Sequence, residues 1–124
     1  MNIVDSSGWL EFFTDGPNAQ KYQLPLKDVE TLVVPVISIY EVFKVVLRER
    51  NEDAAIQAAM VMQKGKVIEI TPSIAIAAAR ISLKLSLPMA DSLILATAEL
   101  YNATIWTQDA DFKDIPGVKY LAKK

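Results

Sequence analysis

Residues 31–50 read TLVVPVISIYEVFKVVLRER, a short β-branched run that leads into a longer segment with helical periodicity. The first part is short and apolar enough to form a buried strand, and Pro35 places the end of that strand near residue 36. After Ser38, apolar residues recur at helical spacing and form one stripe: Ile39, Phe43, Val46 and Leu47. We therefore predict a strand over residues 32–36 and a helix over residues 39–50.

The same alternation of strands and helices continues on both sides of this stretch. Apolar runs predict strands over residues 2–5, 32–36, 66–70 and 103–107, with a last extended piece over 118–122. Helical spacing and end signals, such as Thr71-Pro72 and Gly65, predict helices over residues 6–13, 17–29, 39–50, 53–64, 73–87 and 89–102. This alternation predicts a single α/β domain over residues 1–124, with a parallel sheet covered by helices and the strand C-termini along one edge.

The composition excludes several kinds of chemistry. The 124 residues include no cysteine and no histidine, so a thiol nucleophile, a serine–histidine triad, a histidine-paired ribonuclease and an ordinary zinc site are all excluded. The net charge is -2 and the isoelectric point is about 5.1, so nucleic-acid binding would need a local basic patch or metal ions. The hydrophobic content of 52% and mean hydropathy of +0.22 predict an oligomer or a complex, because a small domain hides only part of its apolar surface.

The sequence also bears on cellular location. The first residues, MNIVDSSGWL, lack a basic segment followed by a long apolar stretch, so we expect no secretory signal. The most apolar region, residues 31–47, is interrupted by Pro35, Glu41 and Lys44, so we expect no membrane span. We expect a cytoplasmic protein, which the absence of cysteine fits.

Four acidic residues fall at the edge where the predicted strands end. Asp5 ends the first strand and Glu41 lies in the first turn of the helix after the second; Asp91 begins the helix before the fourth strand, and Asp109 follows that strand. Carboxylates so close together repel each other, and the cluster therefore requires a cation. Oxygen ligands without histidine or cysteine select a hard ion, Mg²⁺ or Mn²⁺. Such a site suits phosphodiester hydrolysis, because the ion activates water and neutralises charge on the phosphorus oxygens.

Each acid also has a purely structural interpretation. Ser38-x-x-Glu41 is a capping box, and acids are common at the helix starts and turns where Asp5, Asp91 and Asp109 occur. Asp111, two residues after Asp109, is our second choice as a ligand. Four helix caps have no reason to converge on one edge, so convergence of the four acids distinguishes a metal site from separate caps.

Neighbouring polar residues are open to two interpretations. The hydroxyls of Ser6, Ser38 and Thr107 either cap helices or bind a carboxylate or a metal-bound water. Lys44 and Arg48 share the helical face of Glu41 and, with Arg50, form either a solvated surface or a contact to an RNA backbone.

The sequence resembles the PIN domain, and specifically the VapC-type toxins of bacterial and archaeal toxin–antitoxin pairs. The similar stretches, in chain order, are IVDSSGWLEFF, SIYEVFKVVLR, LPMADSLILATA and TIWTQDADFKDIPGV, which together span nearly the whole chain. The resemblance implies a three-layer α/β/α sandwich around a parallel sheet of four to five strands. It also implies Mg²⁺- or Mn²⁺-dependent endoribonuclease activity.

The resemblance assigns roles to particular residues and suggests partners. It implies that the catalytic, metal-binding acids are Asp5, Glu41, Asp91 and Asp109. It matches Thr107 to the hydroxyl of the family's T-x-D motif, and it places Gln108 at a position that is often basic. The implied partners are an RNA substrate, a second copy in a homodimer, and a cognate antitoxin whose peptide occupies the active-site groove.

We therefore hypothesise a metal-dependent endoribonuclease that leaves 5′-phosphate and 3′-hydroxyl ends. A phosphoacceptor receiver domain is one alternative, because it also combines a parallel α/β fold with an acidic Mg²⁺ pocket. A receiver needs paired acids at the end of its first strand and a late lysine, however, where this chain has Ser6 and Gln108. A PIN-like binding module without turnover, whose acids only cap helices or dock a basic peptide, is the second alternative.

Overall fold

The computed structural model describes all residues 1–124. It contains five short strands, which alternate with the helices: β1 (Asn2–Val4), β2 (Val33–Pro35), β3 (Lys66–Ile68), β4 (Thr104–Thr107) and β5 (Val118–Tyr120). Six α-helices and two 3₁₀ turns connect them: α1 (Ser6–Phe13), α2 (Ala19–Lys27), η1 (Val29–Thr31), α3 (Val36–Glu49), α4 (Glu52–Met62), α5 (Pro72–Leu85), α6 (Met89–Tyr101) and η2 (Ala110–Phe112). Every predicted strand and helix is present; α1 has the predicted ends, and the other elements differ at one or both ends.

The strands are all parallel and lie in the order β3-β2-β1-β4-β5. β1 pairs with β4, β4 with β5, and β2 with β3. A single parallel bridge between Asn2 and Leu32 joins the two parts of the sheet. β1 is therefore the central strand, and its partner β4 lies about a hundred residues away in the sequence, Asn2 pairing with Thr104.

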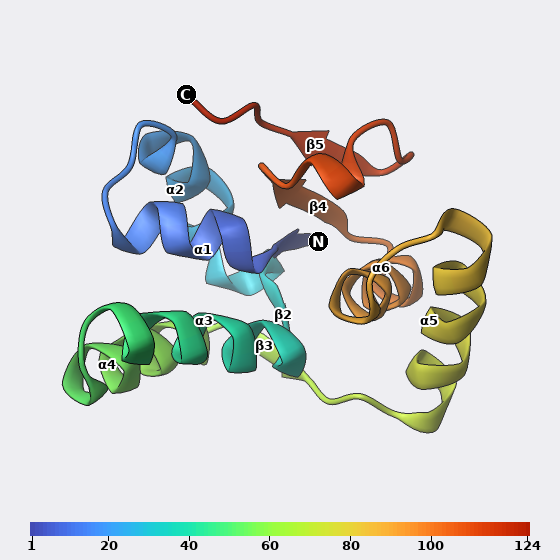
Figure 1. Cartoon of the computed structure of the whole chain (residues 1–124), viewed down its shortest axis with the longest axis horizontal. Coiled ribbons are helices and arrows are strands. Elements are labelled where there is room, and N and C mark those ends of the chain that lie inside the picture. The colour runs from blue at the N-terminus through green and yellow to red at the C-terminus, as the bar shows by residue number, and fades with distance from the viewer.

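Helices cover both faces of the sheet, as Figure 1 shows, with α1–α4 on one side and α5 and α6 on the other. Successive side chains of a strand point to opposite faces. Thus Val4 and Val34 belong to the core under α1–α4, whereas Ile3 and Val33 belong to the core against α6. α5 packs on the outer side of α6 through a third cluster: Ile74, Ala78, Leu93 and Ala96. The predicted three-layer α/β/α sandwich is confirmed.

The start of α5 was predicted correctly from local sequence signals, and the start of α3 was not. Thr71 caps α5, its hydroxyl accepting from the Ile74 amide at 3.2 Å, and Pro72 occupies the first turn as expected. The predicted start of α3 was wrong. This helix begins at Val36, directly after Pro35, with no loop between strand and helix. Ser38 therefore lies inside the first turn and caps nothing, so the capping-box interpretation of Ser38 and Glu41 is wrong.

The predicted apolar stripe of α3 was also partly wrong. The residues of α3 that are fully buried are Ser38 and Val42, and Ile39 and Val46 pack at the edge of the same core. Leu47 is 45% exposed, and the neighbouring Tyr40 is 60% exposed. Much of the apolar surface of α3 thus faces outward instead of toward the sheet.

No single helix is both long and apolar enough to span a membrane; α5 and α6 pass such a test of length and composition only when they are combined, with a bend of 117° between them.

Candidate active site

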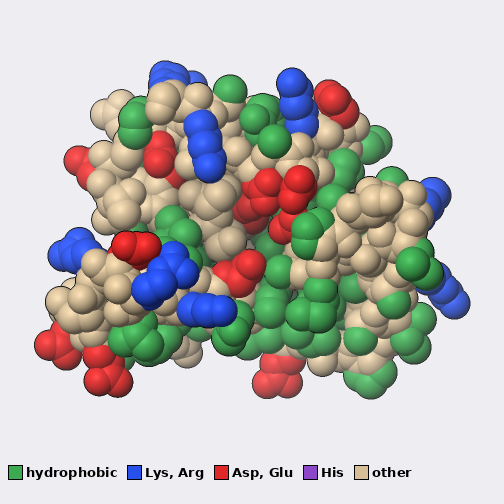
Figure 2. Space-filling model, in the orientation of Figure 1, with side chains coloured by type: hydrophobic (Ala, Val, Ile, Leu, Met, Phe, Trp, Pro, Cys, Tyr) green, Lys and Arg blue, Asp and Glu red, His purple; other side chains and the backbone are tan.

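The acidic residues come together where β1 and β4 end. Asp5 follows β1 directly and Asp109 lies two residues after β4, and these neighbouring parallel strands end at the same edge. Asp91 is the third residue of α6, where the positive end of the helix dipole favours a carboxylate. Glu41 belongs to α3 and lies near enough to Asp109 to be affected by its charge. Figure 2 shows acidic side chains gathered in a hollow at the middle of this face, above an apolar surface.

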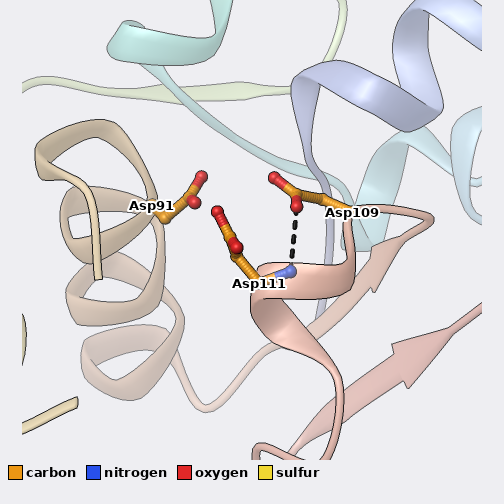
Figure 3. Close-up of side chains that lie close together, drawn as sticks. All are labelled: Asp91, Asp109 and Asp111. Atoms are coloured by element: carbon orange, nitrogen blue, oxygen red, sulfur yellow. Dashed lines mark hydrogen bonds between the residues drawn. The ribbon is translucent and has the colours of Figure 1, made fainter. Parts of the chain in front are cut away.

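Three of the carboxylates form a compact group. Asp91, Asp109 and Asp111 each offer one oxygen, and these oxygens all lie within 4.8 Å of one another. Figure 3 shows Asp91 reaching from α6 toward Asp111 in η2 and Asp109, the residue directly before η2. The η2 turn holds that pair, because the Asp111 amide donates to Asp109 Oδ1 at 2.9 Å. Asp91 is buried, Asp109 half-buried and Asp111 exposed, so the group opens from the interior to the solvent.

Asp5 lies deeper, at 2% exposure, and is fixed by three donors. Oδ1 accepts from the Ser7 hydroxyl at 2.7 Å and from the Gly8 amide at 3.1 Å, and Oδ2 accepts from the Thr107 hydroxyl at 2.7 Å. The bond from Gly8 means that Asp5 also caps α1. Capping and membership of the acidic cluster are therefore compatible for this residue, as they are for Asp109.

Three of the acids have raised pKa values, and burial is the largest cause for each of them. Burial raises the pKa of Asp5 to about 6, against the lowering effect of its hydrogen bonds. Burial also raises the pKa of Asp91 to about 7, and there the charges of Asp109, Asp5, Asp111 and Glu41 add to it. For Glu41, burial raises the pKa, the Ser6 hydroxyl lowers it and the charge of Asp109 raises it. The five acids therefore interact electrostatically as one group.

No basic side chain neutralises these acids. The structure contains one ion pair, between Arg48 and Glu49 at the surface. Glu41 Oε1 is buried and has no hydrogen-bond partner in the protein. Repelling carboxylates, raised pKa values and an unpaired buried carboxylate oxygen all fit a cation bound among these groups. The donor set consists of oxygen alone, which suits Mg²⁺ or Mn²⁺.

A family model of the PIN domain matches residues 3–118. The chain belongs to the PIN domain family. Among curated proteins, no sequence matches significantly.

Solved structures confirm the fold of this PIN domain. A toxin–antitoxin complex from Klebsiella pneumoniae contains a chain that is 22% identical, with a TM-score of 0.85 over 100% of both chains. VapC20 from Mycobacterium tuberculosis, described as a toxin that cleaves the sarcin–ricin loop, is 14% identical, with a TM-score of 0.77 over 90% of this chain and 92% of its own. A VapBC2 structure from Rickettsia felis, bound to a promoter DNA fragment, is 16% identical, with a TM-score of 0.74 over 98% and 97%.

The four predicted acids of the PIN domain lie in one region, but only two belong to its tightest group. Asp91 and Asp109 are joined there by Asp111, our second choice, whereas Asp5 and Glu41 lie beside the group. A carboxylate two residues away joins Asp109 because η2 folds the intervening chain into a tight turn. The sequence predicts a polar turn in this stretch, but its spacing alone did not indicate that the turn brings both carboxylates to Asp91.

The predicted hydroxyls have different environments. Thr107 is fully buried and bridges two acids, since its hydroxyl donates to Asp5 and accepts from the Asp109 amide at 2.9 Å. Ser6 lies beside Glu41. Ser38 is buried without a partner for its hydroxyl. Ser7, which the sequence analysis did not select, holds Asp5. Its signal was its place two residues after that acid, where the first turn of α1 brings the hydroxyl back to the carboxylate.

Proposed function

We propose that this PIN domain is a Mg²⁺- or Mn²⁺-dependent endoribonuclease and the toxin of a toxin–antitoxin pair. The observation that carries the proposal is the group of Asp91, Asp109 and Asp111 oxygens within 4.8 Å, beside an unpaired buried oxygen of Glu41. Membership of the PIN family and the shared fold of the VapC structures support RNA as the substrate. We place the activity in the cytoplasm, where RNA is accessible.

The position of each acid suggests its role in the proposed reaction. Asp91 and Asp109 would hold the ion, with Asp5 behind them and Asp111 at the solvent side. When bound, the ion supplies charge neutralisation on the phosphorus oxygens and activation of water. Glu41 faces the cluster from α3, and its unpaired Oε1 is available to orient the attacking water. Attack by water in line with the departing 3′ oxygen leaves 5′-phosphate and 3′-hydroxyl ends.

An antitoxin peptide is the partner that we propose for the neighbouring groove. A cavity of about 320 Å³ between α1 and α3 includes Ser7 and Gln108, so it begins beside the acids. A second cavity, of about 280 Å³, shares Thr14, Val46 and Arg50 with it and extends the groove toward α4. A segment lying along this groove would end at the catalytic acids.

A homodimer is also part of the proposal. An apolar cavity of about 640 Å³ lies between α5, α6 and the start of α3, and Leu83 and Met89 at its rim are 89% and 72% exposed. Apolar surface of this extent favours a protein partner.

Cleavage of RNA tests the proposal directly. The wild type should cleave RNA in Mg²⁺ or Mn²⁺ and lose the activity in excess EDTA, and Asp5→Asn and Asp91→Asn should each lower the rate by about 100-fold or more. Asp53→Asn is the matched control, because Asp53 is an exposed acid on α4. Equal activity of Asp5→Asn and the wild type would eliminate this site and favour the binding module without turnover. A 2′,3′-cyclic product would refute attack by water.

The receiver-domain alternative has lost its basis, since the chain belongs to the PIN family. Incubation with acetyl phosphate should therefore leave no acyl phosphate on any aspartate.

A further inference from the structure

A buried asparagine holds the turn that carries Asp109. Asn18 precedes α2 and is 0% exposed. Its Nδ2 donates to Gln108 Oε1 at 3.0 Å and to the Ala122 carbonyl at 3.0 Å. Its side chain makes no capping bond to α2. Both donors of the amide are therefore used to connect segments that are about ninety and a hundred residues away.

The Ala122 carbonyl fixes which way the Asn18 amide points. A backbone carbonyl only accepts, so the group facing it must be Nδ2. The second hydrogen of Nδ2 then requires an acceptor, and this orients the Gln108 amide with Oε1 toward Asn18. Gln108 is 8% exposed. Its side-chain oxygen thus points into the protein, although its position in the motif is next to two site residues.

The backbone of Gln108 and its two neighbours connects Asn18 to the acids. Its amide donates to the Ser7 hydroxyl at 3.2 Å, and Ser7 donates to Asp5. On either side of Gln108, Thr107 bonds Asp5, and the Asp109 amide bonds the Thr107 hydroxyl. A shift of Gln108 would therefore move the amide that Ser7 accepts from, the Thr107 hydroxyl and the Asp109 carboxylate together.

Asn18 is itself held from the other side. Its backbone amide donates to Glu11 Oε2 at 2.7 Å, which ties it to α1. Its Oδ1, by contrast, is buried and has no partner. A buried amide with one unpaired polar atom lowers the free energy of unfolding, so stability by itself does not explain an asparagine here. What Asn18 contributes at this position is therefore the pair of hydrogen bonds from Nδ2 to Gln108 and Ala122.

We propose that Asn18 is a positioning residue for the catalytic acids. It holds Gln108, and through Gln108 it keeps the 107–109 turn where the Asp109 carboxylate meets Asp91 and Asp111. This inference rests on the proposed function, because it assigns Asn18 to the same metal-dependent site.

The test compares metal affinity and catalysis in variants that break the bond from either end. Asn18→Ala and Gln108→Ala should each weaken Mn²⁺ binding, measured by electron paramagnetic resonance without RNA, by about 10-fold. Each should lower kcat for RNA cleavage by a similar factor, with KM changed less than twofold. The double variant should lose little more than either single variant, since both remove the same bond.

Asn2→Ala is the matched control. Asn2 Oδ1 accepts from Trp106 Nε1 at 3.0 Å, so it makes a long-range side-chain bond to β4, directly before residues 107–109, but does not touch those residues. It should lower the melting temperature as Asn18→Ala does and leave Mn²⁺ affinity unchanged. If Asn18→Ala and Gln108→Ala are less stable but bind Mn²⁺ and cleave RNA as the wild type does, Asn18 is only structural and the inference fails. If the wild type itself neither binds Mn²⁺ nor cleaves RNA, the proposed function fails, and this inference fails with it.

Discussion

Replacement of Asp5 by asparagine should stabilise the metal-free protein while it abolishes activity. Asp5 is almost completely buried, and its pKa is about 6 compared with an ordinary 3.8. At about 1.4 kcal/mol per pKa unit, ionisation of this group in the folded chain costs about 3 kcal/mol at pH 8. Asparagine keeps an Oδ1 acceptor for Ser7 and Gly8. Its Nδ2 replaces the oxygen that accepts from Thr107, which costs about 1 kcal/mol.

The net gain for Asp5→Asn is therefore about 2 kcal/mol at pH 8, or about 8 °C in melting temperature for a chain of this size. The pH dependence follows from the direction of the pKa shift. A carboxyl whose pKa is raised by folding contributes stability that is complete below the unfolded pKa of 3.8 and is lost as the pH rises through about 6. The advantage of the variant should be greatest above pH 6 and should shrink as the pH falls toward 4.

Thermal or urea unfolding in EDTA, at pH 4.5 and at pH 8, measures this difference. Addition of Mg²⁺ or Mn²⁺ at pH 8 should then stabilise the wild type and leave Asp5→Asn unchanged, because the proposed ion site needs the charge of the Asp5 carboxylate. A variant that is less stable than the wild type at pH 8, or that differs from it equally at both pH values, would show that the Asp5 carboxylate is not strained by burial.

Three other changes test separate parts of the structure. Gly8→Ala should destabilise the fold by about 2 kcal/mol or more by urea unfolding, because the added Cβ would lie 2.6 Å from the ring of Tyr22; an unchanged midpoint would refute the close packing. Thr71→Ala should cost about 1 kcal/mol through loss of the α5 cap, without a change in RNA cleavage. Thr107→Val should lower Mn²⁺ affinity by about 10-fold, since it removes the hydroxyl that holds Asp5, and wild-type affinity would contradict that role.

The fold could be predicted from the sequence because its signals are local. Apolar runs with β-branched residues mark the strands, and Thr71-Pro72 marks the start of a helix at the correct residue. The start of α3 could not be predicted in the same way. Pro35 has the extended φ of −61° and ψ of 135° and serves as the residue before the first turn, so strand and helix meet without a polar boundary. Ser38, three residues later, has the sequence context of an N-cap and therefore gave the wrong predicted start.

The region of the candidate site could be predicted from the sequence, but the set of carboxylates that lie closest together could not. Parallel topology places Asp5 and Asp109 at one edge whatever the details of packing. Membership of Asp111 depends on the η2 turn, and the importance of Ser7 and Asn18 depends on contacts with residues about ninety or a hundred positions away. These contacts are tertiary and leave no periodicity in the sequence.

The pairing of β1 with β4 sets the point in synthesis at which the acidic cluster can form. Asn2 and Thr104 are partners, so the first strand emerges from the ribosome long before the strand that it needs. A nascent chain that stops short of residue 109 lacks two of the three clustered carboxylates. A ribosome that stalls before residue 109 therefore releases a fragment in which this carboxylate cluster cannot form.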